Sequence, residues 1–327
     1  MHSKSSTGIL VGAGFMGKTH LEAYGEIPDV RITAIVDRDG TRASLLAACC
    51  SAEAFTDFGE ALRLKRPDFV DICLPTPLHR TVLLAAVENG ADVLVEKPLA
   101  LGLEDIEAMT EAAQRTGRRV MVAHVCRFMP QYLYARNLIE TERLGKPLFF
   151  GAARESDLPS WSVGEWINDR SQSGGTLLDL SIHDIDISNW LLGKPVCFKA
   201  EEVVKEKGGP AHTISSLGYA CGARASIEAS HLMPLHYPLT TWYRLLLEKG
   251  FVEWKSRGTE SCLSVFTDSG EEKVDLSTLE PKLGGNPYLE EIRHFTDCIQ
   301  EGRPFRIGLA EASLAVETVL KLRTSMQ

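Results

Sequence analysis

The chain has 327 residues, of which 44% are hydrophobic and 24% are charged, and its formal net charge is -9 at pH 7. This length predicts about two domains, and the composition is ordinary for a globular protein. The negative charge argues against nucleic acid or an anionic membrane as a partner, and no apolar run approaches the ~20 residues that span a bilayer.

The N-terminal residues 1–7 lack the hydrophobic core of a secretion signal and are expected to pass directly into a strand. The eight cysteines are scattered, and none stands in a C-x-x-C spacing. The spacing therefore indicates neither a zinc site nor a redox dithiol. Thiols of this kind are typical of a reducing compartment, so the sequence predicts a cytoplasmic protein without a metal centre.

A glycine motif opens the chain. Residues 8–11 are apolar and read as a strand, and a helix is expected to run to about Tyr24 after the pattern G-x-G-x-x-G. In that context the glycines permit a tight turn, a close approach of a pyrophosphate and close packing of helix on strand. The helix N-terminus then offers free N–H groups to the phosphates. The predicted cofactor loop comprises Gly12, Gly14, Phe15, Met16 and Gly17.

Asp37 and Arg38 follow the second predicted strand, residues 30–36. Asp37 lies 20 residues beyond Gly17, where a carboxylate that binds the adenine ribose is expected. An arginine at this place can instead bind the 2′-phosphate of NADP, which Asp37 would repel. Both residues are candidate cofactor contacts, and the sequence favours NAD, with NADP as the alternative.

Strands and helices continue to alternate through the first half. Further strands are predicted at residues 68–74, 93–95 and 119–124, and helices at residues 42–49, 57–64, 77–89 and 103–115. This alternation predicts a doubly wound parallel sheet. The loop after residues 68–74 faces the same edge as the glycine motif and supplies the candidate cofactor contacts Leu74, Pro75, Thr76 and His79. His79 is either a ligand contact or a histidine of the loop.

Glu96, Lys97 and Pro98 directly follow the strand at residues 93–95. Ligands in open α/β sheets bind just beyond the carboxyl ends of strands. Lys97 is therefore expected where a cofactor and a substrate can meet, on a turn that Pro98 stiffens. A surface lysine in a strand–helix loop is the alternative interpretation of this tripeptide.

The pattern changes near residue 125. Helices are predicted at residues 131–142, 176–192, 288–300 and 309–325, and a strand at residues 147–154. Consecutive strands with short turns are predicted at residues 196–205, 212–219, 224–231, 243–248, 251–255, 261–266 and 271–274. Such strands imply an antiparallel sheet. The expected organisation is a dinucleotide-binding domain at residues 1–125 and a substrate-binding and oligomerisation domain at residues 126–327.

Asp179 and His183 are four residues apart in the helix expected at residues 176–192, and so share one face of it. Asp179 can accept a hydrogen bond from one ring nitrogen of His183, which leaves the other nitrogen available as a base. A simple contact on a helix surface is the alternative.

These features together resemble the Gfo/Idh/MocA oxidoreductases, over essentially the whole chain. The resemblance rests on the glycine motif, Glu96-Lys97-Pro98, Arg127-Phe128, the W-x-x-D run from Trp166 to Asp169, and Gly174-Gly175 with Asp179 and His183. It implies a Rossmann domain followed by an α/β domain with a large open antiparallel sheet, whose free face often mediates dimers or tetramers. It also implies a cis peptide bond before Pro98.

The resemblance assigns roles to individual residues. Lys97 corresponds to the lysine that contacts both nicotinamide and substrate hydroxyl, His183 to the general acid/base and Asp179 to its partner. Arg127 and Trp166 are further expected substrate contacts. Val125-Cys126, before Arg127, departs from the polar or basic residues that many members carry.

The sequence thus predicts an NAD(P)-dependent dehydrogenase acting on a secondary alcohol of a polyol, inositol, sugar or sugar derivative, assembled as a homodimer or homotetramer. Two alternatives have the same fold: a cofactor-binding sensor without turnover, and a redox-neutral glycosidase that uses NAD. The presence of both Lys97 and His183 favours the dehydrogenase.

Overall fold

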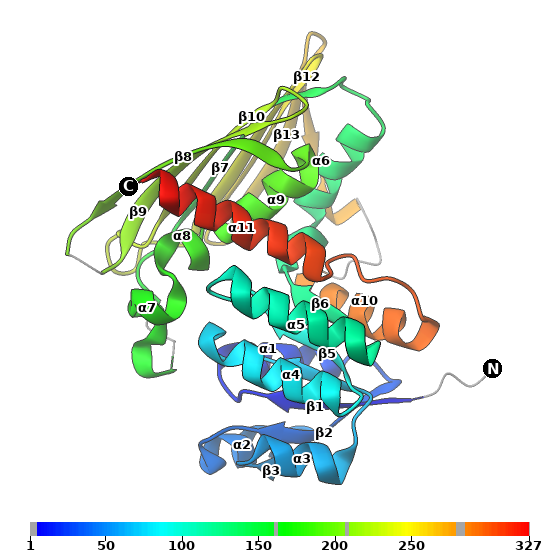
Figure 1. Cartoon of the computed structure of the whole chain (residues 1–327). Helices are drawn as coiled ribbons and strands as arrows, with labels where there is room; N and C mark the ends of the chain where they lie inside the picture. The colour runs from blue at the N-terminus through cyan, green and yellow to red at the C-terminus, as the bar shows by residue number, and fades with distance from the viewer. Residues whose placement is uncertain (1–4, 160–162, 207–208, 279–284, 327) are drawn as a thin grey trace. The chain divides into compact units, whose positions relative to one another are not determined.

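The structure is a computed structural model that describes residues 5–159, 163–206, 209–278 and 285–326 (Figure 1). Its contacts divide the chain into two compact units. Unit 1 comprises Met1–Val125, Trp161–Gly164 and Asn286–Ser313, and unit 2 comprises Cys126–Ser160, Glu165–Gly285 and Leu314–Gln327. The first break falls after residue 125, where a boundary was expected, but the chain returns to unit 1 near its C-terminus.

Unit 1 contains a parallel sheet that has six strands in the described residues, in the order β3-β2-β1-β4-β5-β6. Its strands are β1 (Ser6–Val11), β2 (Val30–Val36), β3 (Glu53–Phe55), β4 (Phe69–Ile72), β5 (Asp92–Glu96) and β6 (Val120–Ala123). This order confirms the predicted doubly wound Rossmann sheet. The sequence analysis missed β3, because three residues are too few to show a periodic pattern.

Helices of unit 1 lie between its strands: α1 (Phe15–Tyr24), α2 (Gly40–Ala48), α3 (Phe58–Lys65), the 3-10 turn η1 (Thr76–Leu78), α4 (His79–Glu88) and α5 (Leu103–Thr116). A further helix, α10 (Pro287–Glu301), comes near the C-terminal end of the chain and packs against α1. Asp39 and Asp57 begin α2 and α3 by accepting backbone N–H bonds at the helix N-termini. The central strands β4 and β5 are buried over their whole length and mostly apolar, so the loops at their carboxyl ends rest on a rigid base.

Unit 2 contains a sheet that has eight strands in the described residues, in the order β14-β13-β12-β11-β7-β10-β9-β8. Its strands are β7 (Pro147–Glu155), β8 (Pro195–Val204), β9 (Ala211–Tyr219), β10 (Arg224–Ser230), β11 (Thr240–Leu247), β12 (Gly250–Arg257), β13 (Glu260–Thr267) and β14 (Gly270–Val274). The expected antiparallel pattern holds except that β7 and β10 pair in parallel. These two strands are distant in sequence, so no hairpin dictates their direction.

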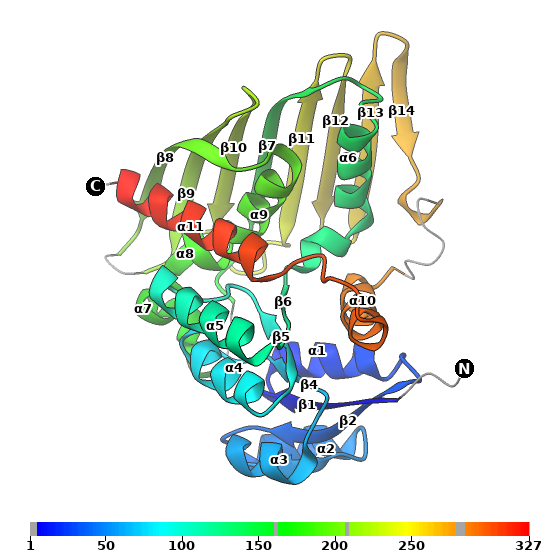
Figure 2. The same ribbon diagram turned by 45° about the vertical axis from the view of Figure 1, so that its right-hand side comes forward.

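Helices cover one face of this sheet, as the two views of Figures 1 and 2 show for α6 and α9. The helical segments are η2 (Val125–Phe128), α6 (Pro130–Glu140), η3 (Val163–Asn168), α7 (Arg170–Ser173), α8 (Gly175–Asp179), α9 (Ile182–Leu192), η4 (Leu276–Thr278) and α11 (Leu309–Ser325). Burial alternates along β11: Tyr243 and Leu245 are buried, whereas Arg244 and Leu246 are exposed. Nowhere in the part of the chain described is a helix long and apolar enough to cross a membrane.

Candidate active site

The glycine loop of unit 1 fits a dinucleotide. Gly12 has a φ of +106°, and a Cβ there would clash with the carbonyl oxygen of Cys73; a Cβ on Gly17 would clash with that of Gly12. By contrast, a Cβ on Gly14 would meet no atom within 4 Å. Gly12 and Gly17 are therefore required by packing, and Gly14 leaves open space at the N-terminus of α1, where a pyrophosphate would approach the backbone.

Asp37 stands beside this loop at the end of β2. Its Oδ2 accepts a hydrogen bond from the amide of Ala13 at 2.9 Å, and its Oδ1 accepts from the amide of Asp39 at 2.9 Å and from Arg42 at 2.8 Å. Burial opposes ionisation, but these hydrogen bonds and the charge of Arg42 lower the pKa of Asp37. An ionised carboxylate is thus available to ribose hydroxyls. Arg38 is exposed.

His79 lies behind the loop that carries Leu74, Pro75 and Thr76. Its ring is buried, with Nε2 2.8 Å from the carbonyl oxygen of Leu74 and Nδ1 3.3 Å from that of Leu99. Burial lowers the pKa of His79, which favours the neutral ring, and a neutral ring can donate to only one of these two carbonyls. Of the two interpretations left open by the sequence, this geometry supports a histidine that joins the loops after β4 and β5.

Lys97 follows β5 directly, and the Lys97–Pro98 peptide bond is cis, as the resemblance implied. Glu96 Oε2 accepts a hydrogen bond from the amide of Lys97 at 3.0 Å. Because β1, β4 and β5 are adjacent parallel strands, the glycine loop, the Leu74 loop and Lys97 all follow carboxyl ends at one edge of the sheet. Unit 1 therefore brings together the lysine and the loop that would bind the cofactor.

A buried histidine lies beneath this edge, and the sequence analysis did not select it. His20 Nδ1 is 2.8 Å from Asp71 Oδ2, and His20 Nε2 is 3.2 Å from Glu96 Oε1. His20 belongs to the buried face of α1, together with Gly17, Leu21 and Tyr24. A histidine within that i, i+3, i+4, i+7 stripe was the signal that could have identified it.

In unit 2, Asp179 and His183 are not on one helix, so the prediction of a continuous helix over residues 176–192 was wrong. Asp179 ends α8, and His183 is in the first turn of α9. The helix breaks at Leu180–Ser181, where the Ser181 hydroxyl lies 3.0 Å from that of Thr213 on β9. A tertiary hydrogen bond between side chains thus accompanies the break.

The break gives each side chain a neighbour from elsewhere in unit 2. His231, which directly follows β10, has Nε2 3.9 Å from Asp179 Oδ2 and Nδ1 3.5 Å from Thr176 Oγ1. His183 Nδ1 is 3.7 Å from the thiol of the buried Cys126. His231 is a further candidate site residue; its position at a strand end was the available sequence signal, as it was for Lys97.

Arg127, an expected substrate contact, is only 3% exposed. Its Nε and Nη2 donate to the two carboxylate oxygens of Asp186 at 2.8 and 2.7 Å, and its guanidinium lies 5.4 Å from the ring of Trp190. Two of its donors therefore serve an ion pair in the core of unit 2, and a role at the substrate remains a prediction.

The tryptophan-rich segment is partly described. Trp166, the other expected substrate contact, lies in η3 and is half-buried, and Asp169 begins α7 by accepting from the amide of Ser171 at 2.9 Å. Trp161 lies outside the described residues. The W-x-x-D run thus contains a helix cap in addition to a candidate contact.

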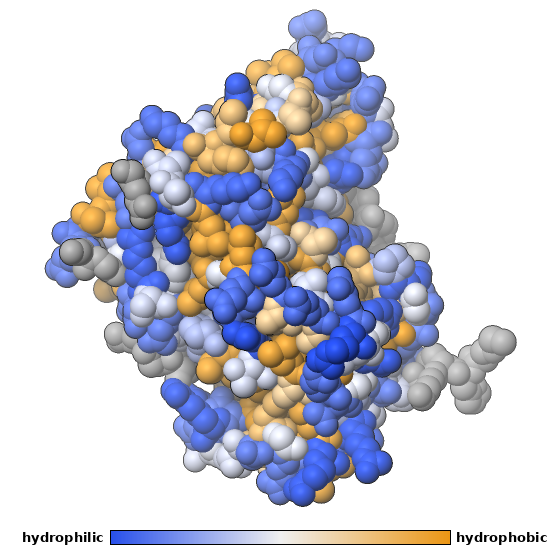
Figure 3. All heavy atoms as spheres, viewed as in Figure 1, coloured by the Kyte–Doolittle hydropathy of each residue, from blue (hydrophilic) through white to orange (hydrophobic). Residues whose placement is uncertain are grey.

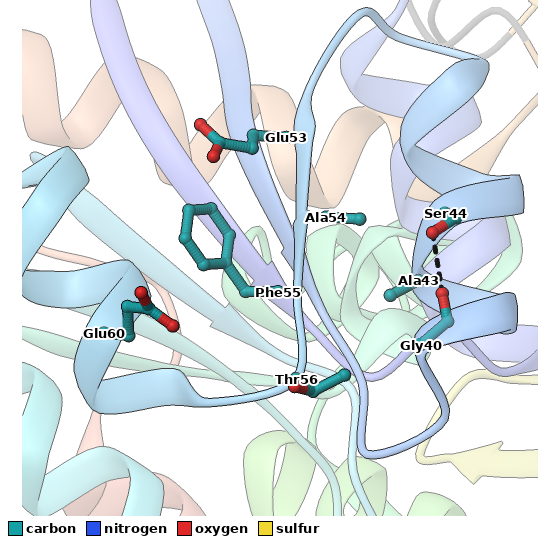
Figure 4. Close-up of a pocket in the computed structure, with 8 residues that line it drawn as sticks. All are labelled: Gly40, Ala43, Ser44, Glu53, Ala54, Phe55, Thr56 and Glu60. Atoms are coloured by element: carbon teal, nitrogen blue, oxygen red, sulfur yellow. Dashed lines mark hydrogen bonds between the residues drawn. The ribbon is translucent and has the colours of Figure 1, made fainter.

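A cavity of unit 1 lies elsewhere, between α2, β3 and the start of α3 (Figure 4). Its lining residues are Gly40, Ala43, Ser44, Glu53, Ala54, Phe55, Thr56 and Glu60. None of the residues predicted for the cofactor or the substrate is among them, so the candidate site is defined by the strand ends and not by this cavity.

Sequence comparison identifies the class. Residues 8–124 match the family model described as an oxidoreductase family with an NAD-binding Rossmann fold, and residues 132–253 match the GFO/IDH/MocA C-terminal domain. The chain is 30% identical to inositol 2-dehydrogenase of Rhizobium meliloti, covering 96% of this chain and 97% of that protein. The chain therefore belongs to the Gfo/Idh/MocA oxidoreductases, which the sequence motifs had predicted.

Two further comparisons are consistent with this family. The scyllo-inositol 2-dehydrogenase (NAD(+)) of Bacillus subtilis is 26% identical, over 97% of this chain and 93% of that protein. Among solved structures, an oxidoreductase of Agrobacterium radiobacter in complex with NAD+, L-tartaric acid and magnesium has a TM-score of 0.86 at 21% identity, covering 98% of this chain and 96% of that one. This structural likeness shows the shared fold.

Proposed function

We propose that the protein is an NAD-dependent dehydrogenase that oxidises a secondary alcohol of a polyol, inositol, sugar or sugar derivative. The observation that carries the proposal is the position of Lys97, directly after β5 and at the sheet edge that holds the glycine loop. The relatives named inositol dehydrogenases support the substrate class.

Each candidate residue has a distinct task. The glycine loop and the N-terminus of α1 bind the pyrophosphate, and Asp37 accepts hydrogen bonds from the ribose hydroxyls. When bound, NAD supplies the hydride acceptor. The Lys97 ammonium donates to the substrate oxygen and stabilises the developing alkoxide, and His183 accepts the hydroxyl proton. Asp179, with His231 beside it, orients the acid–base group.

Spectrophotometric screening tests the proposal directly. Polyols, inositols, aldoses and amino sugars are offered with NAD and with NADP, and nicotinamide absorbance is followed, with the Lys97→Ala variant as control. Net reduction with at least one compound, lost in the control, is the expected result. A cofactor that binds but is never reduced supports the sensor, and turnover of a glycoside without net oxidation supports the redox-neutral glycosidase.

The cofactor preference follows from Asp37. NADP would bring a phosphate dianion next to an ionised carboxylate, and Arg42 already donates to that carboxylate at 2.8 Å. NAD should therefore bind more tightly than NADP in calorimetric titrations of the purified chain. Binding of NADP at least about tenfold tighter would overturn this preference, and would give Arg38 or Arg42 the deciding role.

We also propose that a second copy of the chain covers the face of the unit 2 sheet opposite α6 and α9. Ile214 and Leu246, which alternate with buried neighbours on β9 and β11, are exposed on this face, with exposed fractions of 46% and 40%. Val203 and Val204 add apolar surface on β8, and Figure 3 shows hydrophobic atoms near that edge of the sheet. Exposed apolar faces of this kind are commonly interfaces. Light scattering at micromolar concentration should give the mass of a dimer or tetramer; a monomer would contradict the proposal.

A further inference from the structure

Several ionisable side chains lie together in unit 1 beneath Lys97, and most of them are buried. They come from every element packed around His20: Tyr24 on α1, Asp71 on β4, Cys73 after β4, Glu96 on β5, and Tyr288 and Glu291 on α10. His20, Asp71 and Glu291 are 0% exposed. Such a concentration of charge in a protein interior is costly unless the groups neutralise one another.

The geometry indicates how they do so. Both ring nitrogens of His20 lie near carboxylate oxygens: Nδ1 is hydrogen-bonded to Asp71 at 2.8 Å, whereas Nε2 lies at an ion-pair distance of 3.2 Å from Glu96, without hydrogen-bond alignment. Negative charge on both sides of the ring favours the imidazolium ion. Burial opposes that charge, but Asp71 and Cys73 raise the pKa of His20 well above its usual value. For Glu96, burial is likewise outweighed by the nearby His20 and Lys97, which lower its pKa.

Glu291 has the opposite environment. Neither of its carboxyl oxygens has a hydrogen-bond partner in the described part of the chain. Burial, together with the negative charges of Glu96 and Asp71, raises its pKa well above the usual value for a glutamate. This environment favours the neutral acid form of Glu291, so Asp71 and Glu96 are the carboxylates that balance the charge of His20.

The carboxylate of Glu96 connects this cluster to Lys97. One oxygen, Oε1, faces His20, and the other, Oε2, accepts the hydrogen bond of the Lys97 amide at 3.0 Å. We propose that His20 is a positioning residue for Lys97: held as a cation between Asp71 and Glu96, it fixes the Glu96 carboxylate, which in turn fixes the backbone of Lys97. This inference rests on the role proposed above for Lys97.

Two other functions fit the same side chains less well. The ligand atoms of His20, Asp71 and Cys73 lie within 4.8 Å of one another, as in a metal site. However, His20 and Asp71 are at the 2.8 Å distance of a direct hydrogen bond, which indicates a shared proton. A nucleophilic Cys73 is also disfavoured, because burial and Asp71 raise the pKa of its thiol far above the usual value.

Amide hydrogen exchange tests the connection without substrate or cofactor. The exchange rate of the Lys97 N–H is measured by NMR in the whole chain, in His20→Gln and in the control Glu291→Gln, which replaces a neutral acid of the same cluster by a neutral amide. We expect exchange at least about tenfold faster in His20→Gln and within about twofold of wild type in the control. Equal rates in all three proteins, or equal acceleration in both variants, would overturn the inference.

Turnover in two backgrounds separates this inference from the proposed function. With the substrate found in the absorbance screen, His20→Gln should lower kcat about tenfold in the wild-type chain and less than about twofold in Lys97→Ala, because residues that act through one group are non-additive. If His20→Gln costs the same factor in both backgrounds, His20 does not act through Lys97. If instead Lys97→Ala keeps wild-type turnover, the proposed function fails, whatever the exchange rates show.

Discussion

Both units bury charged side chains, but they neutralise them in different ways. In unit 2 the cations are arginines: Arg127 donates twice to Asp186, and Arg154 lies 3.1 and 3.2 Å from the two carboxylate oxygens of Asp184. In unit 1 the buried cation beneath the site is His20, shared between two carboxylates. A guanidinium keeps its charge at any working pH, whereas an imidazole titrates. The first arrangement is permanent, and the second depends on pH.

The difference matches what each network supports. Asp184 and Asp186 both belong to α9, the helix that carries His183, and their arginines come from β7 and η2. These pairs anchor α9 to the rest of unit 2. The unit 1 network ends instead on one carboxylate, Glu96, and through it on the backbone of Lys97. The arginine–aspartate pairs of unit 2 thus anchor a whole helix, α9, whereas the titratable His20 cluster of unit 1 fixes only the backbone of Lys97.

The largest expected effect is on turnover, to which each unit contributes one proposed catalytic residue. Lys97→Ala or His183→Ala should each lower kcat about 10²–10⁴-fold, the usual loss when acid–base catalysis is removed. The double variant should lose much less than the product of the two factors, because residues of one proton transfer act as a unit. Steady-state kinetics with the substrate from the screen measure all three.

Cofactor binding supplies the control for these variants. The glycine loop and Asp37 should retain NAD in His183→Ala, with a Kd close to that of the wild-type chain. Near-wild-type turnover by Lys97→Ala would remove the catalytic assignment and favour the cofactor-binding sensor.

A smaller effect is expected when one partner of a permanent pair is removed. Asp186→Ala leaves the buried Arg127 uncompensated and should lower the free energy of unfolding by about 3–5 kcal/mol. Replacing both partners, as in Arg127→Met with Asp186→Leu, should recover most of that loss. Urea denaturation gives both values, and Glu201→Ala, on the exposed surface of unit 2, is the matched control.

That control should leave the free energy of unfolding close to that of the wild-type chain, because exposed ion pairs contribute little to stability. A loss in Asp186→Ala no greater than in Glu201→Ala would show that the Arg127 pair does not anchor α9. The conclusion that permanent ion pairs anchor a helix of unit 2 would then be wrong.

Local patterns in the sequence were sufficient for much of the fold. Residues 30–36 are apolar and bounded by turn residues, and β2 has those same limits. The glycine motif was readable because strand, turn and helix residues are consecutive. The division of residues 176–192 into α8 and α9 could not be read from the sequence, because the Ser181–Thr213 contact that accompanies it joins positions 32 residues apart.

The same limit applies to the site. Asp37 and Lys97 could be selected because each directly follows a strand, and β-strand ends are visible in sequence. His20, Asp71 and Glu96 come from three elements, and only the strand order β1-β4-β5 with α1 against it brings their side chains together. Pairing between distant positions has no periodic signature in a single sequence.

The smallest expected effect is a dependence of stability on pH that originates in unit 1. Because the folded-state pKa of His20 is raised, its contribution to stability is present in full below the unfolded pKa of about 6.5 and is lost as pH rises through the raised value. In this window the free energy of unfolding should fall by at most about 1.4 kcal/mol per pH unit for this one proton. The folded-state pKa of Glu291 is also raised, so Glu291 likewise lowers the free energy of unfolding as pH rises, beginning near pH 4.5.

Two variants separate the contributions. Urea denaturation of the wild-type chain, His20→Gln and Glu291→Gln between pH 6 and 9 should give a shallower slope in His20→Gln above pH 6.5, because the titrating ring is gone. Glu291→Gln should instead remove the contribution of Glu291 to the pH dependence of stability and keep the contribution of His20. Asp186→Ala should leave the slope of the wild-type chain unchanged, since a guanidinium keeps its charge throughout this range. If stability falls with pH equally in the wild-type chain and in His20→Gln, His20 is not held as a cation. The unit 1 cluster would then not be the titratable network that the comparison with unit 2 assumes.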